Sequence, residues 1–462
     1  MLIHSPTASV VFGGRFWMQR CRGRRPDGSQ GRGGDVAEPR QQVVAVDLAK
    51  RDLTLDLARV FCVLLVVLIH LLMVGIGADA SGQLVASRPL EAQPWFALAT
   101  WAGQIMPLFF VVGGFASITA WRSAVRRGST PADYVRSRVL RLAQPALPLY
   151  AFFLVGIGAA TLAGIDPALV DLAASGAGTP LWFLAAYTLC QAVVPWMAGW
   201  HARAPRSTLG VLLAGVIAVD AARFATGVAE VGLLNLFFVW VLVQQLGFWF
   251  ADGWLDRRHP LTLLAIAVLA YASLAPLTTL GPYSPDMLFN LNPATLPLVV
   301  LAVAQACILR LLRPALARLM ETSGARAVVF LVGSRLMTIY LWHLPVILLV
   351  SGLALLIPGA APEPGSAAWW WSRIPYFLVV LISVYGLSFI VGRWETPREV
   401  GRTPPGLVVA LAVACAFTPS FLVLQFLMDL PLAAIGTVLL SAAILLLGRW
   451  PSRAPVHRPR GT

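Results

Sequence analysis

Charge is scarce in this sequence. Asp, Glu, Lys and Arg together make up 12% of its 462 residues, about half the share found in soluble domains. Lysine occurs once, at Lys50, against 34 arginines, and Ala, Gly and Pro are abundant. Hydrophobic residues reach 58%. This composition excludes an ordinary soluble domain, and the arginine bias suggests a GC-rich, bacterial genome.

Paired cysteines and familiar hydrolase motifs are also missing. The five cysteines are scattered, without CxxC or metal-ligand spacing, so neither a disulfide framework nor a bound metal is indicated. No GxSxG nucleophile elbow occurs, and no apolar segment of signal-peptide length precedes Leu53. Residues 1–52, rich in Arg, Gly and Pro, are predicted to be a disordered basic cytoplasmic tail, and 449–462 a second, short one.

Long apolar runs dominate the remainder. Windows of about 20 apolar residues, the length that spans a bilayer, recur along the chain. We therefore predict an all-α fold, a polytopic integral-membrane bundle of 10–12 helices over residues 53–448. The twelve windows are 53–75, 95–121, 139–163, 180–199, 208–225, 231–251, 260–280, 294–312, 327–355, 373–392, 406–427 and 430–448.

The positive residues behind the net charge of +14 are distributed unequally between the two sides of the predicted membrane topology. With the N-terminus inside, this topology places all but five of the 35 Lys and Arg residues on one side of the membrane. Arg88, Arg223 and Arg373 fall on the other side, and Arg59 and Arg335 lie within windows. This pattern is typical of a multi-pass plasma-membrane protein with both termini cytoplasmic. The basic charge therefore indicates orientation, and no nucleic-acid partner.

The first window carries three ionisable residues, Asp56, Arg59 and His70. Arg59 and His70 are eleven residues apart, within about 20° of three full helical turns, so they share a face, with His70 ~16 Å deeper. Asp56 is placed to pair with Arg59 at the i,i+3 spacing. Ionisable groups within a span are costly and usually face a protein interior or a wet cavity, so this helix predicts polar chemistry inside the membrane.

The ninth window, predicted as one continuous helix over 327–355, has a similar pattern. Arg335 lies eight residues from its start and His343 sixteen, and Tyr340 precedes His343 by one turn. Because this span also enters from the cytoplasmic side, the Arg and His of both spans would lie at comparable depths. Two histidines at matched depth indicate a shared cavity.

Arg138 and Arg141 lie one turn apart at the cytoplasmic mouth of the third window. Two guanidinium groups on one helix face suit bidentate capture of phosphate. Ordinary positive-inside flanking charge is the alternative.

Other motifs have plain alternatives. Gly113-Gly114 allows close approach of a helix or a ligand, and packing is the simpler explanation. Trp182 could belong to an interfacial aromatic belt. The outer loop 281–293, rich in turn formers, is predicted as a plain loop rather than the lining of an extracellular mouth.

Several of these motifs, in this order, resemble those of the acyltransferase-3 family of membrane O-acyltransferases. LDLARVFCVLLVVLIH resembles the family's first helix, whose hallmark is Arg, ten residues, then His, matched by Arg59 and His70. FFVVGGF resembles its second helix, RVLR its cytoplasmic R-x-x-R, and LWFL and IYLWHLPV two later signatures. The chain departs from the family in its larger helix number and in lacking the SGNH-type hydrolase domain that some relatives carry.

The resemblance implies transfer of an acyl group, with acetyl favoured, from cytoplasmic acyl-CoA to a hydroxyl of a glycan, glycolipid or small-molecule acceptor. Acyl-CoA would be a co-substrate, with no bound cofactor. His70 is then the candidate general base, Arg59 positions the donor, and His343 orients the acceptor or stabilises the oxyanion. Arg138, Arg141 and Arg335 would hold the donor.

Asp56, Gly113, Gly114, Tyr340 and Trp182 are the predicted supporting residues. Direct transfer is favoured over an acyl-enzyme because Cys62 lies eight residues before His70, about 80° around the helix.

Two other functions remain open on sequence alone. Twelve spans with paired intramembrane cations suit a secondary transporter of an anionic metabolite, although we find no half-chain repeat, no internal carboxylate relay and no strongly broken helix pair. A non-catalytic membrane receptor would leave the Arg/His pairs without a role. The acyl group, the acceptor and the oligomeric state are not determined.

Overall fold

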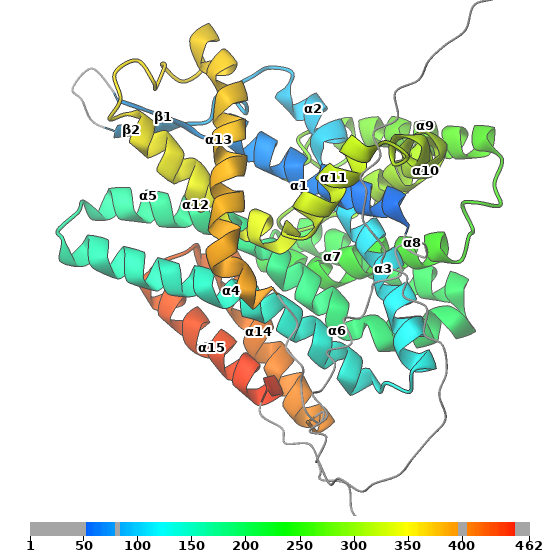
Figure 1. Ribbon diagram of the computed structural model, residues 1–462. Helices are drawn as coiled ribbons and strands as arrows, with labels where there is room; N and C mark the ends of the chain where they lie inside the picture. Colours follow the sequence, from blue (N-terminus) through cyan, green and yellow to red (C-terminus); the bar gives the residue numbers. More distant parts are fainter. Residues whose placement is uncertain (1–51, 79–83, 396–403, 449–462) are drawn as a thin grey trace, which may run out of the picture. The chain divides into compact units, whose positions relative to one another are not determined.

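Helices make up nearly all of the regular structure in the computed structural model, which describes residues 52–78, 84–395 and 404–448 (Figure 1). Both predicted tails therefore lie outside the described residues, apart from Asp52. The α-helices are α1 (Leu53–Met73), α2 (Phe96–Gly103), α3 (Met106–Arg126), α4 (Pro131–Leu162), α5 (Pro167–Gly178), α6 (Trp182–Arg203), α7 (Pro205–Thr226), α8 (Asn235–Ala251), α9 (Pro260–Thr279), α10 (Leu296–Leu319), α11 (Ser323–Gly333), α12 (Leu336–Ala354), α13 (Ala367–Val391), α14 (Gly406–Phe426) and α15 (Leu430–Gly448).

The remaining elements are short. Three 3₁₀ turns, η2 (Thr179–Leu181), η3 (Ala229–Leu234) and η4 (Gly392–Trp394), extend α-helices. Strands β1 (Gly75–Ala78) and β2 (Leu84–Ser87) form an antiparallel hairpin after α1.

The predicted fold class is confirmed. Within the described residues, twelve helical segments are long and apolar enough to cross a membrane, and each matches one predicted window. The two weakest windows, 208–225 and 430–448, correspond to α7 and α15. Figure 1 shows α4 lying between α5 on one side and α15 on the other.

Two of the spanning segments are interrupted and a third predicted window is divided into two helices, so the expectation of no strongly broken helix pair was wrong. α2 ends at Gly103 and α3 begins at Met106, where the side chain of Gln104 accepts from the Met106 N–H. α5 gives way to η2 at Pro180, which has no N–H to continue an α-helix. Hydropathy windows average over such interruptions, so the sequence did not reveal them.

The third interruption corrects the ninth window, predicted as one helix over 327–355. α11 ends at Gly333, and α12 begins at Leu336 with Arg335 as its N-cap, in a non-helical conformation. The side chain of Glu395, at the end of η4, accepts hydrogen bonds from the N–H and the hydroxyl of Thr338 in the first turn of α12. This carboxylate satisfies a first-turn amide that would otherwise lack a partner. Arg335 therefore lies at a helix start rather than inside a span.

Ion pairs gather on the face of the bundle where α1 begins, called the Asp52 face below. Asp52 Oδ2 lies 2.6 Å from Arg313 Nη2, and Asp256 bridges Arg313 and Arg310 of α10. Asp252, after α8, pairs with Arg122 of α3 and His201 of α6 at 2.6 and 2.9 Å. Although burial alone would raise the pKa of Asp252, the hydrogen bonds from Arg122 and His201 hold it below its ordinary value.

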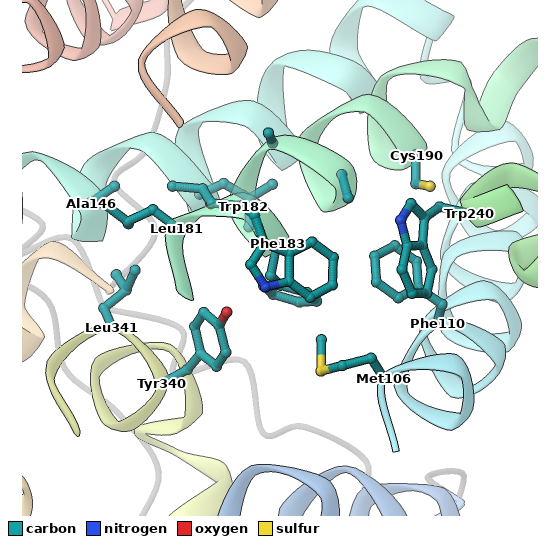
Figure 2. Packing of buried hydrophobic residues seen from close by; sticks show 14 of the residues in the cluster. Met106, Phe110, Ala146, Leu181, Trp182, Phe183, Cys190, Trp240, Tyr340 and Leu341 are labelled. Carbon is teal, nitrogen blue, oxygen red and sulfur yellow. The ribbon is translucent and has the colours of Figure 1, made fainter. Parts of the chain in front are cut away.

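Helix packing is closest between α3 and α8. A Cβ added at Gly114 would overlap the carbonyl oxygen of Gln244, and one added at Gly247 would overlap that of Val111. The two glycines thus allow backbone-to-backbone contact. Beside this contact, Phe110 of α3 stacks on Trp240 of α8 with ring centroids 4.3 Å apart (Figure 2). Gly114 is accordingly a packing residue.

Candidate functional site

The two histidines predicted to share a cavity are in direct contact. α1 packs against α12, and His70 Nδ1 lies 2.9 Å from His343 Nε2, although the two residues are 273 positions apart in the chain. Their rings are 5.0 Å apart between centroids. His343 is completely buried, whereas His70 is partly exposed. The structure therefore joins these two candidate residues into one unit.

The hydrogen bonds of this pair define a direction for the protons. His343 Nδ1 lies 2.6 Å from the backbone oxygen of Tyr340. Because a carbonyl oxygen can only accept, Nδ1 carries the proton, and Nε2 of a neutral His343 is an acceptor. His70 Nδ1 then donates to it, which leaves His70 Nε2 without a proton. For neutral rings, this network provides one free basic nitrogen, on His70.

His70 lines a cavity of about 90 Å³ and His343 does not, so the prediction of a cavity shared by both histidines was wrong. The cavity lies where two of the helix interruptions meet the end of α1, because Gln104 and Ile105 line it from the α2–α3 break and Pro180 from η2. The predicted plain loop 281–293 contributes Leu288 and Leu291, so its role was underestimated. The remaining residues that line the cavity are Val66, Ile69, Met73, Gly103, Met106, Trp182 and Tyr340.

Tyr340 links the cavity wall to the histidine pair. Its hydroxyl donates to the Pro180 carbonyl at 2.6 Å, and its ring lies against Phe183 at a centroid distance of 4.7 Å (Figure 2). Trp182, beside it, is 6% exposed and lines the cavity. The aromatic-belt alternative for Trp182 is therefore excluded in favour of a wall position.

The predicted arginines lie near one another, and two of them lie near the carboxylate of Glu395. Arg141 on α4 is exposed, and it interacts electrostatically with Arg138, Arg59 and Glu395. Glu395 interacts in turn with Arg335, whose guanidinium packs on the backbone of Gly392. Four arginines from α1, α4 and the α11–α12 break thus form a single cationic cluster, which also contains Glu395.

Glu395 was missed by sequence reasoning. It follows the tenth window and belongs to no motif, and nothing local shows that its carboxylate reaches α12. Burial raises the pKa of Glu395 above its ordinary value, while the Thr338 hydrogen bonds and the nearby arginines oppose that shift.

The other predicted supporting residues have modest contacts. Asp56 Oδ1 lies 3.9 Å from Arg59 Nη1, a long ion pair at the expected i,i+3 spacing. A Cβ added at Gly113 would lie 3.2 Å from the ring of Tyr187, so Gly113 makes room for an aromatic side chain next to the arginine cluster. Tyr187 interacts electrostatically with Arg141.

The fold and the site define a multi-pass membrane protein with a buried histidine pair and a cationic cluster. The sequence model of the acyltransferase domain matches residues 52–393, which is most of the chain. The chain therefore belongs to the acyltransferase-3 family and is an acyltransferase. No curated protein and no solved structure matches it.

Proposed function

We propose that this acyltransferase moves a small acyl group, acetyl in the simplest case, from acyl-CoA to a hydroxyl of a glycan, glycolipid or small-molecule acceptor, with His70 as the general base. The observation that carries the proposal is the directional chain from His70 through His343 to the Tyr340 carbonyl. It leaves Nε2 as the free acceptor nitrogen of His70, a residue that lines the cavity.

The reaction would proceed by direct transfer. His70 Nε2 removes the proton of the acceptor hydroxyl, and the oxygen attacks the thioester carbonyl carbon. The tetrahedral intermediate collapses, the C–S bond breaks, and the CoA thiolate leaves and takes up the proton from His70. While His70 is cationic, its Nδ1–H donates to His343 Nε2, which supports the charge without itself touching the substrates.

The size of the cavity supports a small acyl group. Its volume of about 90 Å³ is roughly three times the ~30 Å³ share of one water molecule in the liquid. We expect the three heavy atoms of an acetyl group to fit that space.

The arginine cluster supports an anionic donor. Arg59, Arg138, Arg141 and Arg335 concentrate positive charge beside the N-terminus of α12, and guanidinium groups bind phosphate well. The phosphates of CoA would bind there, on the side we expect to be cytoplasmic, while the acceptor approaches His70 from the opposite side. The plasma membrane with cytoplasmic termini is the location that fits this arrangement.

The test is an acetyl-transfer assay on the full-length protein in nanodiscs, with labelled acetyl-CoA and a cell-envelope extract. His70→Ala should abolish incorporation, because a positioned general base contributes about 10²–10⁴-fold. His259→Asn is the matched control, since exposed His259 only caps α9 and asparagine can cap it too. This control should retain wild-type activity.

Equal incorporation by wild type and His70→Ala would exclude His70 as the base. Incorporation from acetyl phosphate but not from acetyl-CoA would contradict the proposed donor. The labelled product, once isolated, identifies the acceptor.

A further inference from the structure

A second, larger cavity lies on the Asp52 face, formed by residues outside the histidine site and the arginine cluster described above. It has a volume of about 600 Å³ and is lined by the α6–α7 junction, the end of α8 and the loop before α9. Three exposed arginines line it, Arg206, Arg257 and Arg258. No role in acyl transfer has been assigned to any of them.

These arginines have no acidic partner among the described residues. Asp252 and Asp256, the carboxylates nearest in sequence to Arg257 and Arg258, form their ion pairs with residues of α3, α6 and α10 instead. Arg257 donates to the backbone oxygen of Asp252 at 2.5 Å, a contact that leaves its charge uncompensated. The cavity therefore carries three uncompensated positive charges.

Backbone groups add to this charge. Ala204 is the N-cap of α7, and no side chain caps this helix. Pro205, Arg206 and Ser207, its first three residues, line the cavity. An uncapped N-terminus presents free N–H groups and the positive end of the helix dipole, both of which favour an anion.

Two tryptophans form the apolar part of the wall. The guanidinium carbon of Arg258 lies 4.5 Å from the ring centroid of Trp254, and Trp254 contacts Trp249 edge to face at 5.8 Å. The indole Nε1 of Trp249 is buried and has no hydrogen-bond partner within the described structure. Indole rings beside cationic groups are typical of the membrane–water interface.

The helices that leave the cavity are largely open to lipid. Only 28% of the spanning window of α7 and 17% of that of α9 are buried by protein. Val211, Leu261 and Leu264, near the cavity ends of these helices, are at least half exposed. A ligand held in the cavity by an anionic head would find apolar surface for its chains directly beside it.

We propose that this cavity binds the phosphate headgroup of an anionic phospholipid, with Arg206, Arg257 and Arg258 contacting the phosphate and the acyl chains lying along α7 and α9. None of the residues that line this cavity belongs to the histidine site. We therefore assign the bound lipid a structural role and no part in acyl transfer. Lipid binding here would persist even if the acyl donor or acceptor proposed above were wrong.

Native mass spectrometry of the full-length protein, titrated with dioleoyl-phosphatidylglycerol or dioleoyl-phosphatidylcholine, tests the site. The Arg206→Gln/Arg257→Gln/Arg258→Gln variant should lose affinity for phosphatidylglycerol at least tenfold and keep its weak binding of phosphatidylcholine. Because all three side chains are exposed, folding should be retained.

The matched control removes the same charge elsewhere. Arg126, Arg318 and Arg326 are also exposed, are expected on the same face and lie outside the cavity, and their triple Gln variant should bind phosphatidylglycerol as wild type does. Equal loss in both triple variants would show a general basic surface and overturn the site. If inorganic phosphate at low millimolar concentration displaced the lipid, the ligand would be a soluble phosphate and the lipid assignment would be wrong.

Discussion

Replacing His343 tests whether this residue supports His70, the proposed general base, without itself contacting the substrates. His343→Leu places an apolar side chain of similar size in a completely buried position. It removes the Nε2 acceptor that lies 2.9 Å from His70 Nδ1. His70 then loses the partner that keeps the proton on Nδ1 and that supports the imidazolium formed during transfer. His343→Gln is the matched variant, because its side-chain oxygen can occupy the place of Nε2.

The expected magnitude follows from that single contact. A hydrogen bond involving a charged group contributes about 1.5–3 kcal/mol, and about 1.4 kcal/mol corresponds to a factor of ten in rate, so kcat should fall about 10- to 100-fold in His343→Leu. The KM for acyl-CoA should not change, because His343 is not in the arginine cluster. His343→Gln should recover part of the lost kcat.

Steady-state kinetics of both variants in nanodiscs, with melting temperatures measured in parallel, provide the assay. A His343→Leu enzyme with wild-type kcat would refute the proposed role of His343 in supporting His70. So would a His343→Gln enzyme as slow as His343→Leu at equal stability, since the restored acceptor would then have no effect.

Two further predictions concern stability. Gly114→Ala should lower the free energy of unfolding by about 1–3 kcal/mol, because its Cβ would overlap the Gln244 carbonyl. Denaturation should show no loss of unfolding free energy for the control Gly210→Ala, whose Cβ meets nothing within 4 Å. Burial raises the pKa of Glu395 above its ordinary 4.5, so its contribution to stability is present below about pH 4.5 and is lost as the pH rises through the folded-state pKa. The melting temperature of wild type should therefore fall relative to Glu395→Gln between pH 4.5 and 7, and parallel melting curves would contradict this.

The sequence by itself determined the architecture and most of the chemical groups. Hydropathy is a local property, so windows of about 20 apolar residues located all twelve spans of the described structure. The Arg59 and His70 spacing, RVLR and the order of the motifs were enough to predict the family that the domain match confirms. Arg141 and Arg59, predicted to hold and position the donor, lie near one another in the structure, and their role stays a prediction.

Only the tertiary structure decided how these groups meet. A break of one or two residues, as at Arg335 or Gln104, leaves the average hydropathy of a window unchanged, so the interrupted helices could not be read from the sequence. The contact between His70 and His343 depends on how α1 packs against α12. Glu395 reaches α12 from the end of another span. Helix packing in a membrane depends on side-chain fit between distant segments, and that fit, rather than any local pattern, gives His70 its free nitrogen.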